Sequence, residues 1–245
     1  MKTAEEPSLI WQKEAIAFIE WCHQQLWMNP TALTKLYERG LMDDTIKRFK
    51  IGYCPKDIWR NYSEWGIATK IKSNGKPRMI WLPHGLVIPW IHDNGKVLKL
   101  NIRRFKWYPE DKYGKYIKIP GSMNCPATYG DTSLPFGIIL ESEFDSILIQ
   151  QEVGDSIFSI ANGGSCQPLD LYTDFLMRKA SLILFCPDVV DIGGAKFLNR
   201  LQSTCKNGVL WPAPQGKSPG DALMDYGVNL LEWILQGIEY QKFRR

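Results

Sequence analysis

The chain has 245 residues, of which 44% are hydrophobic and 23% are charged. This is the composition of a globular protein, and it excludes an intrinsically disordered chain. No apolar run approaches the roughly 20 residues that a membrane-spanning helix needs, and the first residues do not form a signal peptide. We therefore expect a cytoplasmic protein that does not contact a membrane.

The formal net charge of +4 is unevenly distributed along the sequence. Residues 1–135 contain 21 Lys and Arg against 13 Asp and Glu, whereas residues 136–245 contain 9 against 13. A basic half joined to an acidic half indicates a protein that holds a polyanion with one part and acts on phosphates with the other. The six cysteines form no C-x-x-C pair, and none lies at zinc-ligand spacing from a histidine. We expect no zinc and reduced, structural cysteines.

The first predicted element is a helix over residues 8–28, where apolar side chains recur at helical spacing and Ser8 stands as the N-cap. We expect its tryptophans to pack in the core rather than to stack on bases. A break at residues 29–30 ends this helix. A short helix over residues 31–39 follows and is closed by Gly40.

Residues 78–119 predict a β-rich region. Three of its segments, 79–83, 85–91 and 96–105, have the composition of strands. The sequence Asp-Asn-Gly at 93–95 favours a tight hairpin turn between the second and the third.

The segment from Lys96 to Lys118 contains eight Lys and Arg against two acids, with five aromatic residues interleaved. Such a segment suits a track for single-stranded DNA or an RNA/DNA hybrid, because cations bind phosphates and rings stack on bases. The alternative is a solvated hairpin with ordinary cross-strand aromatic pairs. The cations expected to bind DNA are Lys96, Lys99, Arg103, Arg104, Lys106, Lys112 and Lys115.

From residue 136 onward, predicted strands and helices alternate. We expect strands at 138–140, 156–161, 181–185 and 208–211, with helices at 144–152, 169–178 and 194–204 between them. Crossovers of this kind give an α/β fold with a parallel sheet flanked by helices. A last amphipathic helix over 229–243 is expected to pack across one face. We therefore divide the chain into an α+β basic N-terminal subdomain, residues 1–135, and an α/β domain, residues 136–245.

Two of these strands end in acids. The apolar run 136–140 is followed by Glu141, and the run 180–186 is followed by Asp188 and Asp191. The carboxyl ends of parallel strands form the crevice where α/β sheets bind ligands. Carboxylates gathered there repel one another unless a cation lies between them, and their oxygens suit Mg²⁺ or Mn²⁺. The pattern therefore predicts metal-assisted phosphoryl chemistry.

The motifs of this half resemble the TOPRIM domain, which DnaG-type bacterial primases share with topoisomerases and some nucleases. The motifs stand in the order usual for that domain: Glu141 with Glu143 and Asp145, the turn 162–165, the Asp-rich turn leading into 193–196, and 219–223. The resemblance implies that Glu141 holds a metal ion or accepts the proton of an attacking 3′-hydroxyl, with Asp188 and Asp191 completing the catalytic set and Asp145 supporting it. It also implies that Asp221 joins the metal ligands, and that the phosphate-binding residues are Gly163, Gly164, Lys196 and Lys217.

Two positions depart from the family pattern. Val189 stands where the second acidic motif usually has its first acid, which leaves Asp188 one residue early. Ser218 replaces the first acid of the third motif. A site with these losses is expected to hold one metal ion well and a second weakly.

Residues 36–55 resemble the stretch by which DnaG-type primases enter the polymerase core after their zinc-binding module. The stretch predicts two short helices separated by Gly40, with Asp43 or Asp44 capping the second, and then an extended exit. The zinc module expected before this point is absent from the sequence. We expect that any such module is supplied by a separate protein.

The resemblance implies a primase core that makes short RNA primers on single-stranded DNA from ribonucleoside triphosphates, with a helicase as a candidate partner. Two alternatives stay open: a degenerate subunit that binds DNA or a replication protein without chemistry, and a TOPRIM nuclease. A topoisomerase is disfavoured, because the chain lacks room for the domain that carries the nucleophilic tyrosine.

Overall fold

The computed structural model describes residues 4–163, 169–188 and 205–242. The chain forms two compact units. The N-terminal unit contains Glu5–Lys35 and Asp43–Asn124, and the C-terminal unit contains Leu36–Met42 and Cys125 onward. The short segment 36–42 therefore belongs to the C-terminal unit, although it lies early in the sequence. Within the described ranges, each helix is too short or too polar to cross a membrane.

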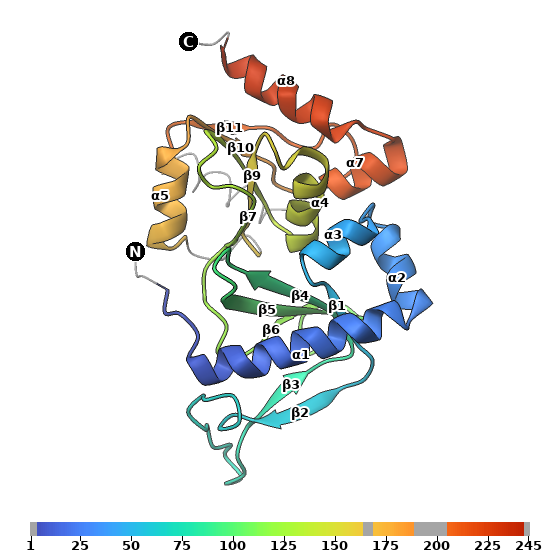
Figure 1. The fold of residues 1–245 in the computed structure, drawn as a ribbon, viewed down its shortest axis with the longest axis vertical. Helices are drawn as coiled ribbons and strands as arrows, with labels where there is room; N and C mark the ends of the chain where they lie inside the picture. The colour runs from blue at the N-terminus through green and yellow to red at the C-terminus, as the bar shows by residue number, and fades with distance from the viewer. Residues whose placement is uncertain (1–3, 164–168, 189–204, 243–245) are drawn as a thin grey trace. The chain divides into compact units, whose positions relative to one another are not determined.

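The N-terminal unit is built on a four-stranded sheet with one long helix on it (Figure 1). The sheet has the order β1 (Gly52–Cys54), β4 (Gly85–Ile91), β5 (Val97–Arg104) and β6 (Tyr116–Lys118), and each neighbouring pair is antiparallel. Helix α1 (Leu9–Trp27) contacts β1, β4 and β5. The predicted hairpin turn is confirmed, because β4 pairs with β5 and Gly95 has a φ of +82°.

The predicted first helix and its cap are confirmed. The side-chain oxygen of Ser8 accepts a hydrogen bond from the backbone N–H of Trp11 at 3.2 Å. Trp11 is only 1% exposed, and its indole Nε1 donates to the carbonyl oxygen of Pro120 at 2.8 Å. This tryptophan therefore fixes the helix in the core, as expected.

Two short helices follow α1, namely α2 (Pro30–Tyr37) and α3 (Asp43–Arg48). Gly40 separates them and adopts a φ of +79°, a conformation that glycine takes without steric strain. The prediction that Asp43 or Asp44 caps α3 is wrong. Both acids lie inside its first turn, where they favour the positive end of the helix dipole.

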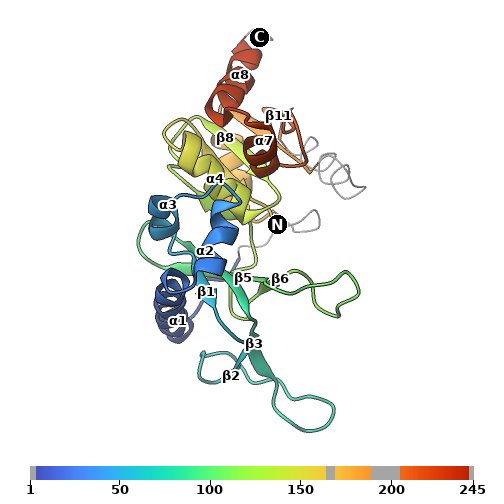
Figure 2. The ribbon, with the colours of Figure 1, turned by 90° about the vertical axis from the view of Figure 1, so that its right-hand side faces the viewer.

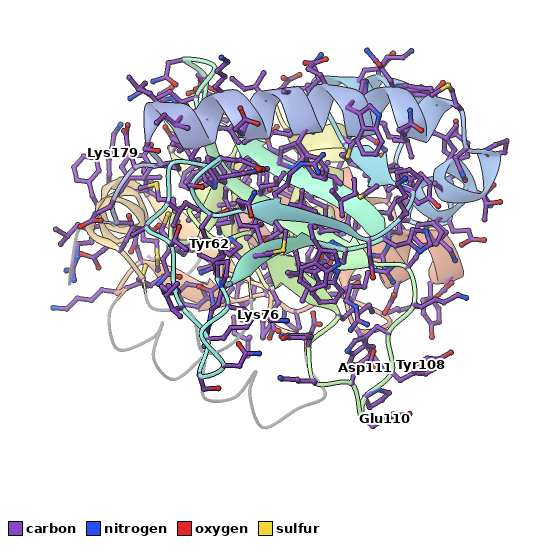
Figure 3. All side chains as sticks on the ribbon, turned by 90° about the horizontal axis from the view of Figure 1, so that it is seen from below. Tyr62, Lys76, Tyr108, Glu110, Asp111 and Lys179 are labelled. Atoms are coloured by element: carbon purple, nitrogen blue, oxygen red, sulfur yellow. The ribbon has the colours of Figure 1, made fainter. Side chains whose placement is uncertain are left out.

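Strands β2 (Ile58–Asn61) and β3 (Met79–Leu82) form a separate two-stranded antiparallel sheet in the N-terminal unit. The loop between them and the loop between β5 and β6 project from the same side of this unit (Figure 2). In Figure 3, Lys76 lies on the first loop, and Tyr108 and Asp111 lie on the second.

The C-terminal unit contains the predicted parallel sheet. Its order is β11 (Gly208–Leu210), β10 (Leu182–Phe185), β8 (Phe136–Leu140), β9 (Phe158–Ala161) and β7 (Ala127–Tyr129). The first four strands are parallel, and the sequence analysis did not foresee the antiparallel edge strand β7. The fold class is confirmed.

Helices cover both faces of this sheet (Figure 1). Helix α4 (Glu143–Val153) lies on one face and α5 (Leu171–Lys179) on the other. Helices α7 (Pro219–Tyr226) and α8 (Leu230–Lys242) both contact α4. The helix expected at 194–204 lies outside the described residues.

Candidate active site

Glu141 follows the last residue of β8 and stands beside the next strand of the sheet. Its backbone carbonyl accepts a hydrogen bond from the N–H of Gly163 at 2.9 Å, and the N–H of Asn162 donates to Leu140 at 2.8 Å. These two bonds hold the turn after β9 against the end of β8. Gly163 has a φ of +71°, which favours glycine there. A predicted phosphate-binding residue thus lies next to the predicted catalytic glutamate.

The buried thiol of Cys186 follows the last residue of β10. The backbone N–H of Cys186 donates to the carbonyl of Ile139 at 3.0 Å, which places Cys186 beside β8. Burial raises the pKa of the Cys186 thiol, and the negative charges of Asp145, Asp188 and Glu141 raise it further. The acids that follow β8 and β10 therefore gather at one edge of the sheet, as the sequence pattern indicates.

Asp145 lies in the first turn of α4, where Ser142 is the N-cap and accepts a hydrogen bond from the Asp145 N–H at 3.2 Å. The carboxylate Oδ1 of Asp145 accepts a hydrogen bond from the N–H of Gly220 at 3.2 Å. Burial raises the pKa of Asp145, whereas hydrogen bonds from Ser142, Gly220 and Ser218 and the charge of Arg39 lower it. Because burial is the largest of these effects, the pKa is raised overall.

Ser218, which replaces a family acid, begins helix α7. Its Oγ accepts a hydrogen bond from the N–H of Asp221 at 3.4 Å, and Pro219 occupies the first helical position. The Asp221 Oδ2 in turn accepts from the N–H of Lys217 at 3.1 Å. One carboxylate oxygen of Asp221, a predicted metal ligand, is therefore already engaged by the backbone of the turn.

A cavity of about 140 Å³ lies where this turn meets α4 and the segment 36–42, all within the C-terminal unit. Its lining residues are Glu38, Arg39, Phe144, Asp145, Ser218, Gly220, Asp221, Met224 and Asp225. The cavity thus combines four carboxylates with one guanidinium. An acidic cavity that also holds an arginine can bind a cation beside an anionic group such as a phosphate.

The sequence analysis did not single out Arg39. Its guanidinium carbon lies 4.9 Å from the centroid of the Phe144 ring. The side chain of Gln151 holds the neighbouring backbone, because its Nε2 donates to the Gly40 carbonyl and its Oε1 accepts from the Met42 N–H, both at 2.8 Å. Arg39 lies within the stretch 36–55 that resembles the primase family, but that resemblance does not indicate its approach to Asp145.

Several positions of the predicted motifs lie outside the described residues, among them Gly164, Val189, Asp191 and Lys196. Lys217 is described and exposed. Within the described ranges, no three His, Cys, Asp or Glu side chains group closely enough to hold a metal ion. The predicted ligand set includes Asp191, so the described part of the chain contains only part of that set.

The structure changes the expected DNA-binding track in the N-terminal unit. Lys99 is 3% exposed, with its Nζ 5.7 Å from the centroid of the Trp90 ring, so the prediction that it contacts DNA is wrong. Lys96 forms an ion pair with Glu6 at 2.6 Å. Arg103 and Lys115 are partly exposed, and Lys106 and Lys112 are exposed.

Arg104 has a structural role in the loop that follows β5. Its guanidinium pairs with Asp111 at 3.0 Å and donates to the backbone carbonyl of Tyr113 at 2.9 Å. It also lies 5.3 Å from the centroid of the Trp81 ring. These contacts occupy the side chain that was expected to bind phosphate.

Comparisons with known proteins give the same family by sequence and by fold. No family model matches the chain. A DNA primase from Chlamydia muridarum is 27% identical over 94% of this chain, and the match spans 41% of that relative's length. A DNA primase domain from Pseudomonas aeruginosa has a TM-score of 0.69 and 20% identity, covering 92% of this chain and 78% of that one.

A further structure with this fold is a DnaG primase catalytic domain bound to single-stranded DNA. It has a TM-score of 0.65 and 16% identity, and the match covers 93% of this chain and 81% of that chain. The chain spans less than half the length of the curated DNA primases that it matches, because each match covers 41% of the relative. The chain is thus similar in sequence to DNA primases and shares the fold of DnaG-type primase catalytic domains.

Proposed function

We propose that the chain is a primase-type nucleotidyltransferase, which makes short RNA primers on single-stranded DNA by metal-dependent phosphoryl transfer. The observation that carries the proposal is the placement of Glu141 and Asp188 shortly after the neighbouring parallel strands β8 and β10, at the carboxyl edge of the sheet. The likeness to DNA primases along 94% of the chain supports it.

The donor set fits Mg²⁺ or Mn²⁺. The predicted ligands are carboxylates, the hard oxygen ligands that these ions prefer. Within the described residues no three such groups lie close enough to hold an ion, and the predicted set also includes Asp191. The residues that would hold the ions are Glu141, Asp188, Asp191 and Asp221. When bound, such ions neutralise the charge that develops on a transferred phosphoryl group.

The residues of the chain then have distinct roles. Glu141 would take up the proton of the attacking 3′-hydroxyl or bind a metal ion. Gly163 lies beside it and leaves room for a nucleotide phosphate to approach the backbone. Burial raises the pKa of Asp145 overall, and the charge of Arg39 opposes this rise, which would favour the charged carboxylate when a substrate enters. Lys196 and Lys217 would contact the triphosphate of the incoming nucleotide.

The proposed partners follow from the same reaction. Single-stranded DNA and the RNA/DNA hybrid would bind to the N-terminal unit, whose sequence carries most of the positive charge. One solved relative is described as bound to single-stranded DNA. A helicase and a separate zinc-module protein are candidate protein partners.

A non-catalytic binding subunit is the second candidate function, and one observation favours it. Ser218 stands where the family pattern has an acid, and its hydroxyl hydrogen-bonds with the backbone of α7 and with Asp145. A chain that no longer needed its second metal ion could accept such a replacement.

Incorporation of labelled ribonucleotides on a single-stranded template tests the proposal, with Mg²⁺ or Mn²⁺ and a zinc-module partner where one is known. We expect weak synthesis that Glu141→Gln abolishes. Cleavage of labelled DNA in a parallel reaction would indicate a nuclease instead. Intact DNA binding without synthesis or cleavage, in the presence of the partner, would indicate the binding subunit.

A further inference from the structure

Four side chains form an aromatic column on one side of the N-terminal unit. Trp59 on β2 lies directly opposite Trp81 on β3, and the two rings stack with centroids 6.0 Å apart and planes 17° apart. Trp81 also contacts the Tyr113 ring at 5.2 Å and the Arg104 guanidinium at 5.3 Å. The strand register and the Arg104 ion pair with Asp111 therefore fix the column from both sides.

The outer member of the column, Trp59, leaves much of its indole in water. It is 53% exposed, although its ring stacks against that of Trp81. A tryptophan that is held flat by a second ring and open on its other face is a ready platform for another planar group. The residues that hold Trp59 are thus organised before any ligand arrives.

A basic hairpin continues directly from this two-stranded sheet. The backbone N–H of Arg78 donates to Lys70 at 2.7 Å, and that of Lys72 donates to Lys76 at 2.8 Å, so residues 70–78 fold back on themselves. Lys70, Lys72, Lys76 and Arg78 are all exposed. Between Glu64 and Asp93 the sequence contains these four cations and no acid.

The register places one cation of the hairpin near the platform. Arg78 immediately precedes β3 and stands three residues before Trp81, and the Trp59–Trp81 pair lies two residues along the ladder from Met79, which borders the hairpin. Two residues of strand correspond to roughly 7 Å, which is close to the spacing of successive phosphates in an extended single strand. One unpaired base on Trp59 would thus have its flanking phosphates near the hairpin.

We propose that Trp59 and the basic hairpin 70–78 form a binding site for unpaired DNA, in which a base stacks on Trp59 and the hairpin cations bind the adjoining phosphates. The nature of the ligand rests on the proposed function. The site lies outside the segment 96–118 that the sequence indicated as the DNA track. Duplex DNA does not fit this site, because its bases are already stacked on one another.

The test measures the affinity of the complete chain for a fluorescent dT oligonucleotide by anisotropy. Trp59→Ala is expected to weaken binding by about 5- to 100-fold, the range for loss of one stacked base, without changing the salt dependence. Trp59→Phe keeps a ring and should retain most of the affinity. Phe175→Ala is the matched control, because Phe175 is similarly exposed at 58% but lies on α5 in the C-terminal unit.

The hairpin is tested in the same assay by Lys72→Ala with Lys76→Ala. This double variant should flatten the salt dependence by roughly 0.7 per lost phosphate contact. A duplex of the same length should bind Trp59→Ala and the natural chain equally well. Should Trp59→Ala fold poorly by circular dichroism, Trp59→Phe decides alone, since it should reduce the quenching of tryptophan fluorescence that the oligonucleotide causes.

The outcomes separate this site from the proposed function. Unchanged single-strand affinity in folded Trp59→Ala, or undiminished quenching in Trp59→Phe, would overturn the site even if the chain makes primers. Conversely, Trp59-dependent binding by a chain that makes no primers would support the site and reject the proposed enzyme.

Discussion

The backbone N–H of Gly220 donates a hydrogen bond to the carboxylate of Asp145 at 3.2 Å. The turn that begins α7 is therefore held against the first turn of α4. A Cβ atom at position 220 would lie 2.9 Å from the same Asp145 oxygen, which leaves space there only for glycine unless the carboxylate moves. Through this contact, the third acidic motif of the sequence reaches the first.

The burial of Asp145 predicts how stability depends on pH. The pKa of Asp145 is raised in the folded chain, chiefly by burial, so the folded state binds its proton more tightly than the unfolded state does. The protonated form stabilises the fold fully below the unfolded pKa, near 3.9, and this stabilisation is lost as pH rises through the folded pKa.

Asp145→Asn should remove this pH dependence. We expect the difference in the free energy of unfolding, variant minus natural chain, to increase from pH 4 to pH 7, because only the natural chain loses the contribution of protonated Asp145. Urea unfolding in a buffer with a chelator measures it, since the chelator keeps divalent ions from the carboxylates. Asp174→Asn, at a partly buried position of α5 that is paired with Arg178, serves as the comparison. If this difference in the free energy of unfolding is the same at pH 4 and pH 7, burial does not raise the pKa of Asp145.

Ser218 offers a second prediction, about charge in the cavity. Ser218→Asp retains a side chain that can cap α7, but it adds a carboxylate beside Asp145. Without divalent ions, the added repulsion should lower Tm by roughly 2–4 °C, which corresponds to about 1 kcal/mol for a chain of this size. With Mn²⁺ present, the variant should gain more thermal stability than the natural chain does.

The matched control is Ser218→Asn, which caps a helix equally well but adds no charge. If Ser218→Asn gains as much thermal stability with Mn²⁺ as Ser218→Asp does, the gain comes from the shape of the side chain and not from its charge. If neither variant responds to Mn²⁺, no second ion binds at this turn. The double variant Val189→Asp with Ser218→Asp is expected to raise primer synthesis above that of the natural chain.

Glu141 is the residue expected to contribute most to ion binding. Ions that bind only the folded state stabilise it by about 1.4 kcal/mol for each tenfold rise in their concentration above Kd. Glu141→Gln should remove most of this increase in a thermal titration with Mg²⁺ or Mn²⁺. Glu239→Gln, at an exposed position of α8, should leave the stabilisation by these ions unchanged. Equal titration curves for all three chains would show that the ions bind elsewhere.

The sequence predicted the sheet and the place of its acids because both follow from local patterns. Apolar runs of strand length that end in Glu141 and Asp188 were sufficient, since parallel strands end at one edge. Arg39 was missed because its approach to Asp145 depends on the path of the segment 36–42, which belongs to the C-terminal unit. No spacing in the sequence announces such a contact.

The predicted DNA track at residues 96–118 was wrong in part for a related reason. Composition counts Lys99 and Arg104 as cations but cannot show which way a strand residue faces or which acid it meets. Lys99 faces the interior, and Arg104 meets Asp111. The exposed cations of residues 70–78 were overlooked because no aromatic residues are interleaved with them in the sequence. Their aromatic neighbours come from β2 and β3, through pairing across the strands.

The last prediction separates cations that bind DNA from one that organises the loop after β5. Lys106→Ala with Lys112→Ala removes two exposed charges, so affinity for single-stranded DNA should fall and the salt dependence should flatten by roughly 0.7 for each lost phosphate contact. Arg104→Ala removes the ion pair with Asp111 and the hydrogen bond to Tyr113. It should therefore increase hydrogen exchange in residues 105–115, while its effect on the salt dependence stays smaller than that of the double lysine variant.

Arg104→Lys, which keeps the charge but loses the planar stacking on Trp81, should resemble Arg104→Ala in hydrogen exchange. If Arg104→Ala instead flattened the salt dependence as strongly as the double variant and left exchange unchanged, Arg104 would be a phosphate contact after all.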